Sequence, residues 1–216
     1  MMIRKHPTIK GKLELVLLDH GIYADITKSS RLSYTKLWRG ILSQDEDMIK
    51  TASRELDVQF PELFASMVVN RRYEDIMNSD KVNNNFDRLA VKHDKKSVEE
   101  TRLYALEYHK EIVEILDGMK RELLLVFKTN DYLRAIDNRL GQPANTFNII
   151  NDYTWRVFQK ELVEVDPVAR SKFSQERRRY YVFKTKMFFL RVYLYVMSYF
   201  GVKPHPDYMK EFEFDV

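Results

Sequence analysis

Residues 13–23 read LELVLLDHGIY, and this stretch decides the fold that we predict for the chain. The run Val16–Leu18 is unbroken and apolar, which is typical of a strand covered on both faces. The strand ends on Asp19, so its carboxylate is expected at the edge of the core, where it faces a cleft. Gly21 allows the backbone to turn sharply directly afterwards, because glycine has no Cβ to clash.

The triplet Asp19-His20-Gly21 has the form of the Asp-Phe-Gly triplet with which protein kinases hold magnesium against ATP phosphates. Magnesium takes one or two carboxylates together with phosphate oxygens and water, so a single rigid aspartate suffices on the protein side. The alternative is a strand-end aspartate that caps an ordinary turn, since a bare D-x-G triplet is a weak signal. His20 stands in the place of Phe, and we expect it to pack rather than to act as a general base.

The residues before this stretch predict a β-hairpin. Met1–Lys5 and Lys12–Leu18 are its two strands, and Pro7 and Gly11 lie in the turn between them. A secretory signal does not fit, because Glu14 interrupts the apolar run. A mitochondrial presequence does not fit either, because Pro7 and Gly11 would break its helix.

Three separated blocks resemble the UbiB-like atypical kinases, also called aarF-domain-containing kinases, and they occur in that family's order. The blocks are LELVLLDHGIY at residues 13–23, PELFASM at residues 61–67 and LLLVFKTNDYL at residues 123–133. Asp-His-Gly in place of Asp-Phe-Gly makes the chain similar to the mitochondrial branch of animals and fungi. The resemblance runs from the first residues to about Gly141.

The resemblance implies a mainly α fold, the helical C-lobe of a protein-kinase-like fold with a short N-terminal β-hairpin. It implies Mg²⁺ and ATP for the complete protein, a mitochondrial setting, and a role in lipid or ubiquinone homeostasis. The only site residue that it assigns is Asp19, as the metal ligand. No catalytic residue and no cofactor-binding residue is assigned.

The other parts of the family's active site have no match in the chain. The phosphate loop, the strand lysine and the His-x-Asp-Pro-His-Pro-Gly-Asn stretch would all precede the triplet. We therefore expect a C-terminal fragment of a larger kinase-like protein, from a truncated gene model or a true fragment. Its partner would be the N-terminal kinase-like portion, and alone it would be inactive and bind neither ATP nor Mg²⁺ tightly.

The composition agrees with a mostly helical domain. Only 6 Gly and 6 Pro occur in 216 residues, and 31% charged residues argue against a membrane-embedded protein. The absence of Cys excludes disulfides and a thiolate zinc site, and the 5 His are too scattered for a zinc site of their own. The net charge of +4 does not by itself indicate nucleic acid, and it is compatible with an anionic membrane surface.

Apolar periodicity predicts a series of helices after the triplet. The first begins at a cap of Asp25 or Thr27 and runs to about Leu42, with Gly40 as its stop signal. Ser43–Glu46 form a capping box for the second helix. The positions expected to face inward in the second helix are Met48, Ile49, Ala52 and Leu56.

The middle of the chain alternates helix and loop. Pro61 opens a third helix, and residues 70–96 are predicted to be a mobile loop with one short helix over Tyr73–Met77. A second capping box at Ser97–Glu100 opens a long helix that ends near Gly118. The next predicted helices cover Met119–Phe127 and Asp131–Leu140, with Thr129 as the cap between them and Gly141 as the end.

We predict a partial kinase-like C-lobe over residues 1–141 and a C-terminal helical extension over residues 142–216, packed on the lobe. The extension contains a helix over Phe147–Val165, a break at Pro167 and a last helix from about Ser174 to Phe200.

The last helix suggests an alternative function. A basic cluster that includes Arg177, Arg178 and Arg179 precedes the apolar segment Phe188–Phe200. The segment is too short for a membrane span, so it is either buried against the lobe or a partner, or laid on a membrane surface. Apolar residues all round the helix favour burial. The alternative function is a non-catalytic helical module that binds a partner or a membrane through this helix, without nucleic acid.

Overall fold

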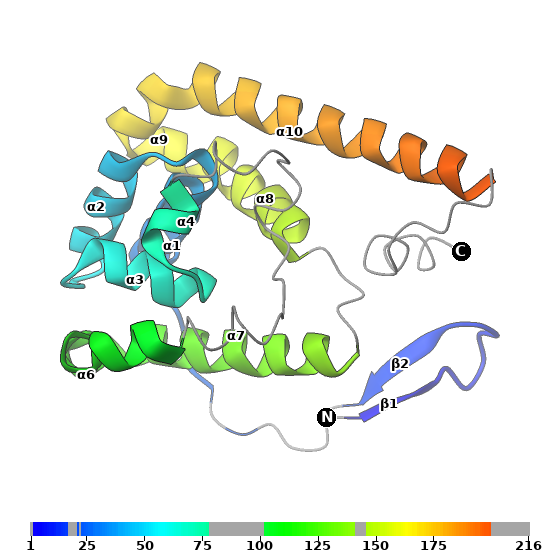
Figure 1. Cartoon of the computed structure of the whole chain (residues 1–216), viewed down its shortest axis with the longest axis horizontal. Helices are drawn as coiled ribbons and strands as arrows, with labels where there is room; N and C mark the ends of the chain where they lie inside the picture. The colour runs from blue at the N-terminus through cyan, green and yellow to red at the C-terminus, as the bar shows by residue number, and fades with distance from the viewer. Residues whose placement is uncertain (1, 17–20, 22, 78–101, 141–145, 200–216) are drawn as a thin grey trace.

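The structure is a computed structural model, and it describes residues 2–16, 21, 23–77, 102–140 and 146–199 (Figure 1). The described chain is mainly helical with one N-terminal antiparallel hairpin, which confirms the predicted fold class. The elements are β1 (Met2–Lys5), β2 (Leu13–Val16), α1 (Lys28–Ser43), α2 (Glu46–Glu55), α3 (Pro61–Val69), α4 (Tyr73–Met77), α6 (His109–Gly118), α7 (Arg121–Arg139), α8 (Thr146–Val157), a π-helical turn η2 (Phe158–Leu162), α9 (Val163–Val165) and α10 (Pro167–Tyr199). Residues 102–107 are also helical.

The predicted hairpin is present, but its second strand does not have the predicted burial. Met2 pairs with Val16 and Lys5 with Leu13, while Gly11 turns the chain at φ +83°. The prediction of a strand covered on both faces is wrong for β2, because Leu13 and Leu15 are 58% and 57% exposed. The sheet has only two strands, and Figure 1 shows it standing apart from the helices, so no described element covers either face.

Helix α1 is the central helix of the fold. Thr27 caps it as predicted, because its side chain accepts a hydrogen bond from the N–H of Ser30 at 3.2 Å. The helix does not stop at Gly40 but continues to Ser43, and Gln44 ends it in the left-handed conformation. Gly40 lies where α1 crosses α2, since a Cβ there would come within 2.9 Å of the Ile49 side chain. The glycine is therefore required for close packing of two helices, not for a turn.

One hydrophobic core joins α1, α2, α3, α6 and α7. The predicted inward positions of α2 are all buried, but its cap is Asp45, which accepts from the N–H of Met48, because Ser43 still belongs to α1. The helices predicted at Pro61 and over Tyr73–Met77 are confirmed. The buried members of this core are Leu37, Trp38, Ile41, Ile49, Ala52, Leu56, Val58, Leu63, Phe64, Ala65, Val68, Val69, Ile115, Met119 and Leu123.

Two helix boundaries in the middle of the chain were predicted wrongly. Helix α7 is continuous, and Thr129 lies inside it, where its hydroxyl donates to the carbonyl of Leu125 at 2.8 Å. The helix expected before it is interrupted at Tyr108, although α6 ends at Gly118 as predicted. The predicted mobile segment after Met77, the capping box at Ser97–Glu100 and the stop at Gly141 lie outside the described residues.

The C-terminal helices confirm the break at Pro167 and move the start of the last helix. Asp166 accepts from the N–H groups of Val168 and Ala169 at 2.8 and 3.3 Å, so it caps α10. Pro167 is then the first helical residue, where its missing N–H costs nothing, and α10 begins seven residues before the predicted Ser174. The helix predicted over Phe147–Val165 is confirmed, with the π-helical turn inside it.

A second, smaller core joins α1 to the C-terminal helices. It is built from Leu32 of α1 together with Trp155, Phe158, Leu162 and Ala169. Helix α1 therefore lies between the first core and the C-terminal helices, of which α10 runs along the top of the molecule in Figure 1. The predicted domain boundary after Gly141 falls on residues that the structure does not describe, and it stays a prediction.

Candidate functional site

The candidate metal site lies on the segment between β2 and α1. Asp19 and His20 of the triplet lie outside the described residues, so the role of Asp19 stays a prediction. Gly21 is described, and its φ of +45° is in the left-handed region that favours glycine. The sharp turn expected after Asp19 involves residues that the structure does not describe, and it stays a prediction.

The segment that follows the triplet is tied to α7. The hydroxyl of Thr27 donates to the Glu122 carboxylate at 3.4 Å, and the hydroxyl of Ser30 donates to the same oxygen. Tyr23 and Ile26, together with α7, line a hollow of about 310 Å³. These contacts fix where the chain enters α1.

The best-built polar cluster in the described chain was not predicted from the sequence. Arg39, in the middle of α1, is 2% exposed and donates from Nε to Glu176 of α10 at 3.0 Å. A second N–H donates to Asn151 Oδ1 of α8 at 2.7 Å. The guanidinium also lies 5.7 Å from the Trp155 ring centroid. The available signal was an arginine within the apolar run from Leu37 to Leu42, which requires an acceptor if it is buried.

A second buried cation on α1 bridges two other helices. The Lys36 ammonium donates to Glu55 at 2.7 Å and pairs with Asp166, the cap of α10. Burial favours the neutral form of Asp166, but the Lys36 ammonium and the backbone N–H groups of Val168 and Ala169 outweigh it. They hold the pKa of this carboxyl below its ordinary value of 3.8.

This pair predicts a pH-dependent loss of stability in Asp166→Asn. A carboxyl whose folded-state pKa is lowered stabilises the fold above its ordinary pKa of 3.8 and loses that effect as the pH falls through the folded value. Asparagine keeps the cap, so at pH 7 the variant should lose about 1.5 kcal/mol of unfolding free energy through its charge alone. Urea unfolding should show this difference shrinking below pH 3.8.

The matched control for this prediction is Asp47→Asn, an exposed change in the first turn of α2. It should change the unfolding free energy by less than about 0.5 kcal/mol at either pH. A loss in Asp166→Asn that is equally large at pH 7 and at pH 3 would contradict the charge-based explanation.

Most of the basic side chains expected to form one cluster at the start of the last helix have separate partners in the structure. Lys172 pairs with Asp45 at 2.5 Å and Lys184 with Asp152 at 2.8 Å, so both fasten α10 to the body. Arg179 donates to Glu176 at 3.0 Å. The guanidinium of Arg177 lies 5.8 Å from the Phe173 ring, and Arg178 and Lys186 are exposed.

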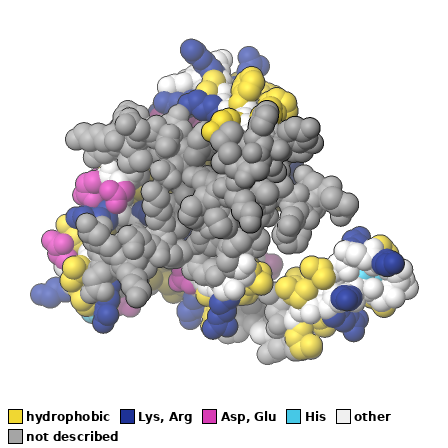
Figure 2. Space-filling model, turned by 45° about the vertical axis from the view of Figure 1, so that its right-hand side comes forward, with side chains coloured by type: hydrophobic (Ala, Val, Ile, Leu, Met, Phe, Trp, Pro, Cys, Tyr) yellow, Lys and Arg dark blue, Asp and Glu magenta, His cyan; other side chains and the backbone are white. Residues whose placement is uncertain are grey.

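The second half of α10 carries large exposed apolar side chains. Phe188, Phe189 and Tyr193 are 62%, 64% and 58% exposed, so the expected burial against the lobe is not found for these residues. Figure 2 shows hydrophobic side chains next to Lys and Arg at the top of the molecule, and again on the hairpin at the lower right. Within the part of the chain that the structure describes, no helix is long and apolar enough to cross a membrane.

Metal ligands of the usual kind do not gather elsewhere among the described residues, where no group of three His, Asp or Glu side chains could hold an ion. The metal ligand predicted from the sequence, Asp19, lies outside these residues and would need oxygen atoms from a ligand or from water beside it. That donor set, one carboxylate with phosphate oxygens and water, is one that Mg²⁺ accepts.

Comparison with known proteins gives matches in one family. The model of the ABC1 atypical kinase-like domain matches residues 1–53, which include the hairpin, the triplet and α1. AarF domain-containing protein kinase 1 of Mus musculus is 35% identical over 153 residues, 70% of this chain and 27% of the relative. AarF domain-containing kinase 1 of Drosophila melanogaster is 33% identical over 142 residues, 65% of this chain and 26% of the relative.

A more distant relative is the ABC1 family protein MCP2 homolog of Schizosaccharomyces pombe, 29% identical over 150 residues. The chain spans about a quarter of the length of the curated relatives that it matches. No solved structure matches it.

Proposed function

This chain belongs to the ABC1, or aarF-domain, family of atypical kinases, and from that premise we propose that Asp19 holds Mg²⁺ against the phosphates of ATP or ADP. The chain supplies the metal ligand and its helical support in a kinase-like domain, while the phosphate-holding residues come from outside these 216 residues. Bound Mg²⁺ would neutralise phosphate charge and bridge phosphate oxygens. We also propose the mitochondrial setting and the role in lipid or ubiquinone homeostasis that the family implies.

The observation that carries this proposal is the place of the triplet. Along the chain it lies between β2, which ends at Val16, and α1, which begins at Lys28, all within the segment that matches the ABC1 domain. We expect the Asp19 carboxylate to be restricted from both sides. The contacts of Thr27 and Ser30 with Glu122 supply the restriction on the helical side.

The proposal predicts that Asp19→Ala removes Mg²⁺-dependent nucleotide binding. The test uses a chimera in which this chain's segment replaces the segment that it matches in the mouse relative, because that relative supplies the remaining domain. Calorimetry should show ADP binding that depends on Mg²⁺, and Asp19→Ala should weaken it by at least about tenfold. The 216-residue chain alone should hydrolyse no ATP.

The control is Asp25→Ala, which removes an exposed carboxylate six residues further along the same segment. It should leave Mg²⁺-dependent ADP binding within about twofold. Unchanged Mg²⁺-dependent ADP binding in Asp19→Ala would overturn the proposal. ATP hydrolysis by the chain alone that Asp19→Ala abolishes would overturn the expectation that the isolated chain is inactive.

A second candidate function is contact with an anionic membrane surface through α10. The exposed Phe188, Phe189 and Tyr193 lie beyond the exposed Arg177 and Arg178, which is the arrangement of an interfacial helix. In flotation with vesicles of phosphatidylcholine and phosphatidylserine, the chain should float with the anionic vesicles. Phe188→Ser with Phe189→Ser should abolish this, and no flotation of the unmodified chain would exclude the membrane contact.

A further inference from the structure

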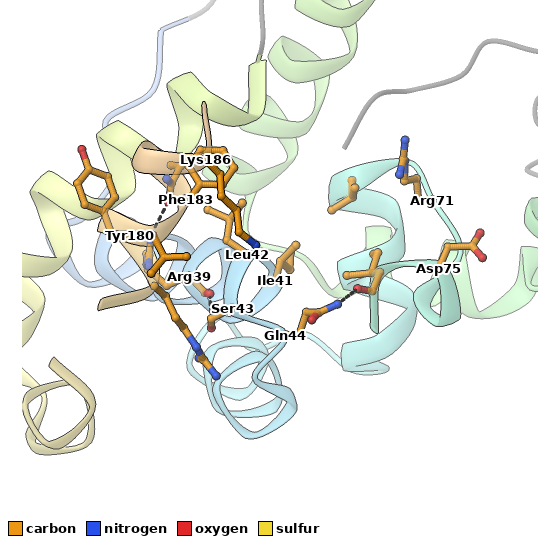
Figure 3. Close-up of a pocket in the computed structure, with 15 residues that line it drawn as sticks. Arg39, Ile41, Leu42, Ser43, Gln44, Arg71, Asp75, Tyr180, Phe183 and Lys186 are labelled. Atoms are coloured by element: carbon orange, nitrogen blue, oxygen red, sulfur yellow. Dashed lines mark hydrogen bonds between the residues drawn. The ribbon is translucent and has the colours of Figure 1, made fainter. Parts of the chain in front are cut away.

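A cavity of about 220 Å³ lies where the end of α1 meets α4, α8 and the middle of α10. Figure 3 shows Tyr180, Phe183 and Lys186 of α10 on one side of it and Arg71 and Asp75 on the other. The described residue of the triplet, Gly21, does not line it. Nothing in the proposed nucleotide function uses it.

The cavity has an apolar wall. Ile41 and Leu42 of α1 lie between the two sides in Figure 3, and Ile76, Val182 and Phe183 complete the apolar lining. Such a wall favours the alkyl part of a ligand, because apolar surface leaves water there.

One buried polar group in the lining has no partner among the described residues. Asn151 is 5% exposed, and its side-chain Nδ2 makes no hydrogen bond. The orientation of this amide is fixed by chemistry, because Arg39 can only donate and therefore requires Oδ1 on its side. The N–H₂ group is left as a buried donor, which is unfavourable until an acceptor oxygen reaches it.

The charge of the lining favours an anion. Arg39, Arg71, Arg179 and Lys186 line the cavity together with Asp75. Glu176, which lies behind the lining, accepts hydrogen bonds from Arg39 and Arg179. Among the described residues, Arg39, Arg179 and Lys186 thus bring three cations, with Glu176 as the acceptor of two of them, to a donor that lacks an acceptor there.

We propose that this cavity binds an anionic amphiphile, an alkyl carboxylate or alkyl phosphate. One of its oxygens accepts from Asn151 Nδ2 near Lys186, and its first methylenes lie on Ile41 and Phe183. The volume equals that of about seven water molecules, which is room for the head and the start of a chain.

The rest of the alkyl chain has a path along α10. Val182 lines the cavity and is 46% exposed, and positions 182, 186, 189, 193 and 196 share one helix face. The members of this face beyond Lys186 are the exposed Phe189, Tyr193 and Val196. An apolar stripe thus leads out of the cavity from its cationic end.

The test compares three probes that differ by one part each: decyl phosphate, decanol and inorganic phosphate, the first two kept below their aggregation limits. Calorimetry on the full 216-residue chain should show one decyl phosphate bound at least about tenfold more tightly than either of the others. Fluorescence of Trp155 should change with the same midpoint, since its ring stacks on Tyr180 of the cavity at 5.0 Å.

Two variants test the assignment of the residues. Asn151→Asp keeps the oxygen that accepts from Arg39 but removes the donor, so binding of decyl phosphate should weaken by at least about tenfold. Lys186→Gln should weaken it by about threefold to tenfold. Arg178→Gln is the matched control, because it removes an exposed cation of the same helix that does not line the cavity, and binding should stay within about twofold.

Each alternative result would overturn the inference. If inorganic phosphate binds as tightly as decyl phosphate, the cavity is a simple anion site. If decanol binds as tightly as decyl phosphate, the cavity is an apolar site without anion recognition. An equal effect of Arg178→Gln and Lys186→Gln would mean general attraction to a basic helix. The last alternative is that Asn151→Asp binds decyl phosphate as tightly as the unmodified chain. If its melting temperature is unchanged, so that the variant is folded, this result would mean that the Asn151 amide does not bind the ligand.

Discussion

Replacing Arg39 with alanine is expected to lower the free energy of unfolding by about 3–5 kcal/mol. The change leaves Glu176, which is 1% exposed, with only Arg179 as a partner, and it leaves the buried Asn151 Oδ1 without its donor. Arg39 also links α1 to two other helices, because it donates hydrogen bonds to Asn151 of α8 and to Glu176 of α10. Its loss should therefore loosen the C-terminal helices first.

Urea unfolding followed by circular dichroism measures this loss, and Arg31→Ala is its matched control. Arg31 lies on the same helix and makes a two-point contact with Glu161 at 3.0 and 2.6 Å, but its side chain is 43% exposed. An exposed ion pair contributes only about 0.2–1 kcal/mol. Similar losses in the two variants would contradict the importance given to burial.

Replacing Phe64 with alanine is the second large effect, with an expected loss of about 3–5 kcal/mol. Phe64 of α3 is fully buried, and its ring lies 5.6 Å from the ring of Phe127 of α7. The change removes a ring of the first core that has no exposed surface and leaves a cavity, because the surrounding side chains relax only partly. The measurement is again urea unfolding, whose midpoint and m value give the free energy of unfolding.

Phe188→Ala is the control for the second effect, because this ring is 62% exposed on α10. It should alter the unfolding free energy by less than about 0.5 kcal/mol. A loss in Phe188→Ala as large as that in Phe64→Ala would mean that α10 is packed in solution against a surface that these contacts do not include.

The sequence predicted the elements of this fold better than their boundaries. Local signals such as Thr27, Pro61 and the apolar positions of α2 act within one turn, so they could be read directly. Gly40 predicts a helix end from local sequence alone. Its actual role is to let Ile49 of another helix come close, which the local sequence does not show. Thr129 has the residue type of a helix cap. The local sequence does not show that its hydroxyl donates instead to the carbonyl of Leu125 in the preceding turn.

The polar clusters could not be predicted for a similar reason. Arg39 finds Asn151 and Glu176 at 112 and 137 residues' distance along the chain, and sequence spacing does not specify which carboxylate a buried cation will meet. The exposure of β2 and of the second half of α10 could not be predicted from their apolar residues. An apolar run indicates a surface that another surface covers, but it does not say whether that surface belongs to the same chain.

The most direct test of the central claim maps the metal on the chain itself. Fe²⁺ replaces Mg²⁺ in the chimera with ADP, ascorbate and peroxide are added, and mass spectrometry locates the backbone cuts made by hydroxyl radicals released at the ion. If Asp19 holds the ion, we expect cuts beside Asp19 that require ADP, that excess Mg²⁺ suppresses and that Asp19→Ala abolishes. Cuts at the same place in Asp19→Ala, or cuts only elsewhere in the domain, would contradict this role of Asp19.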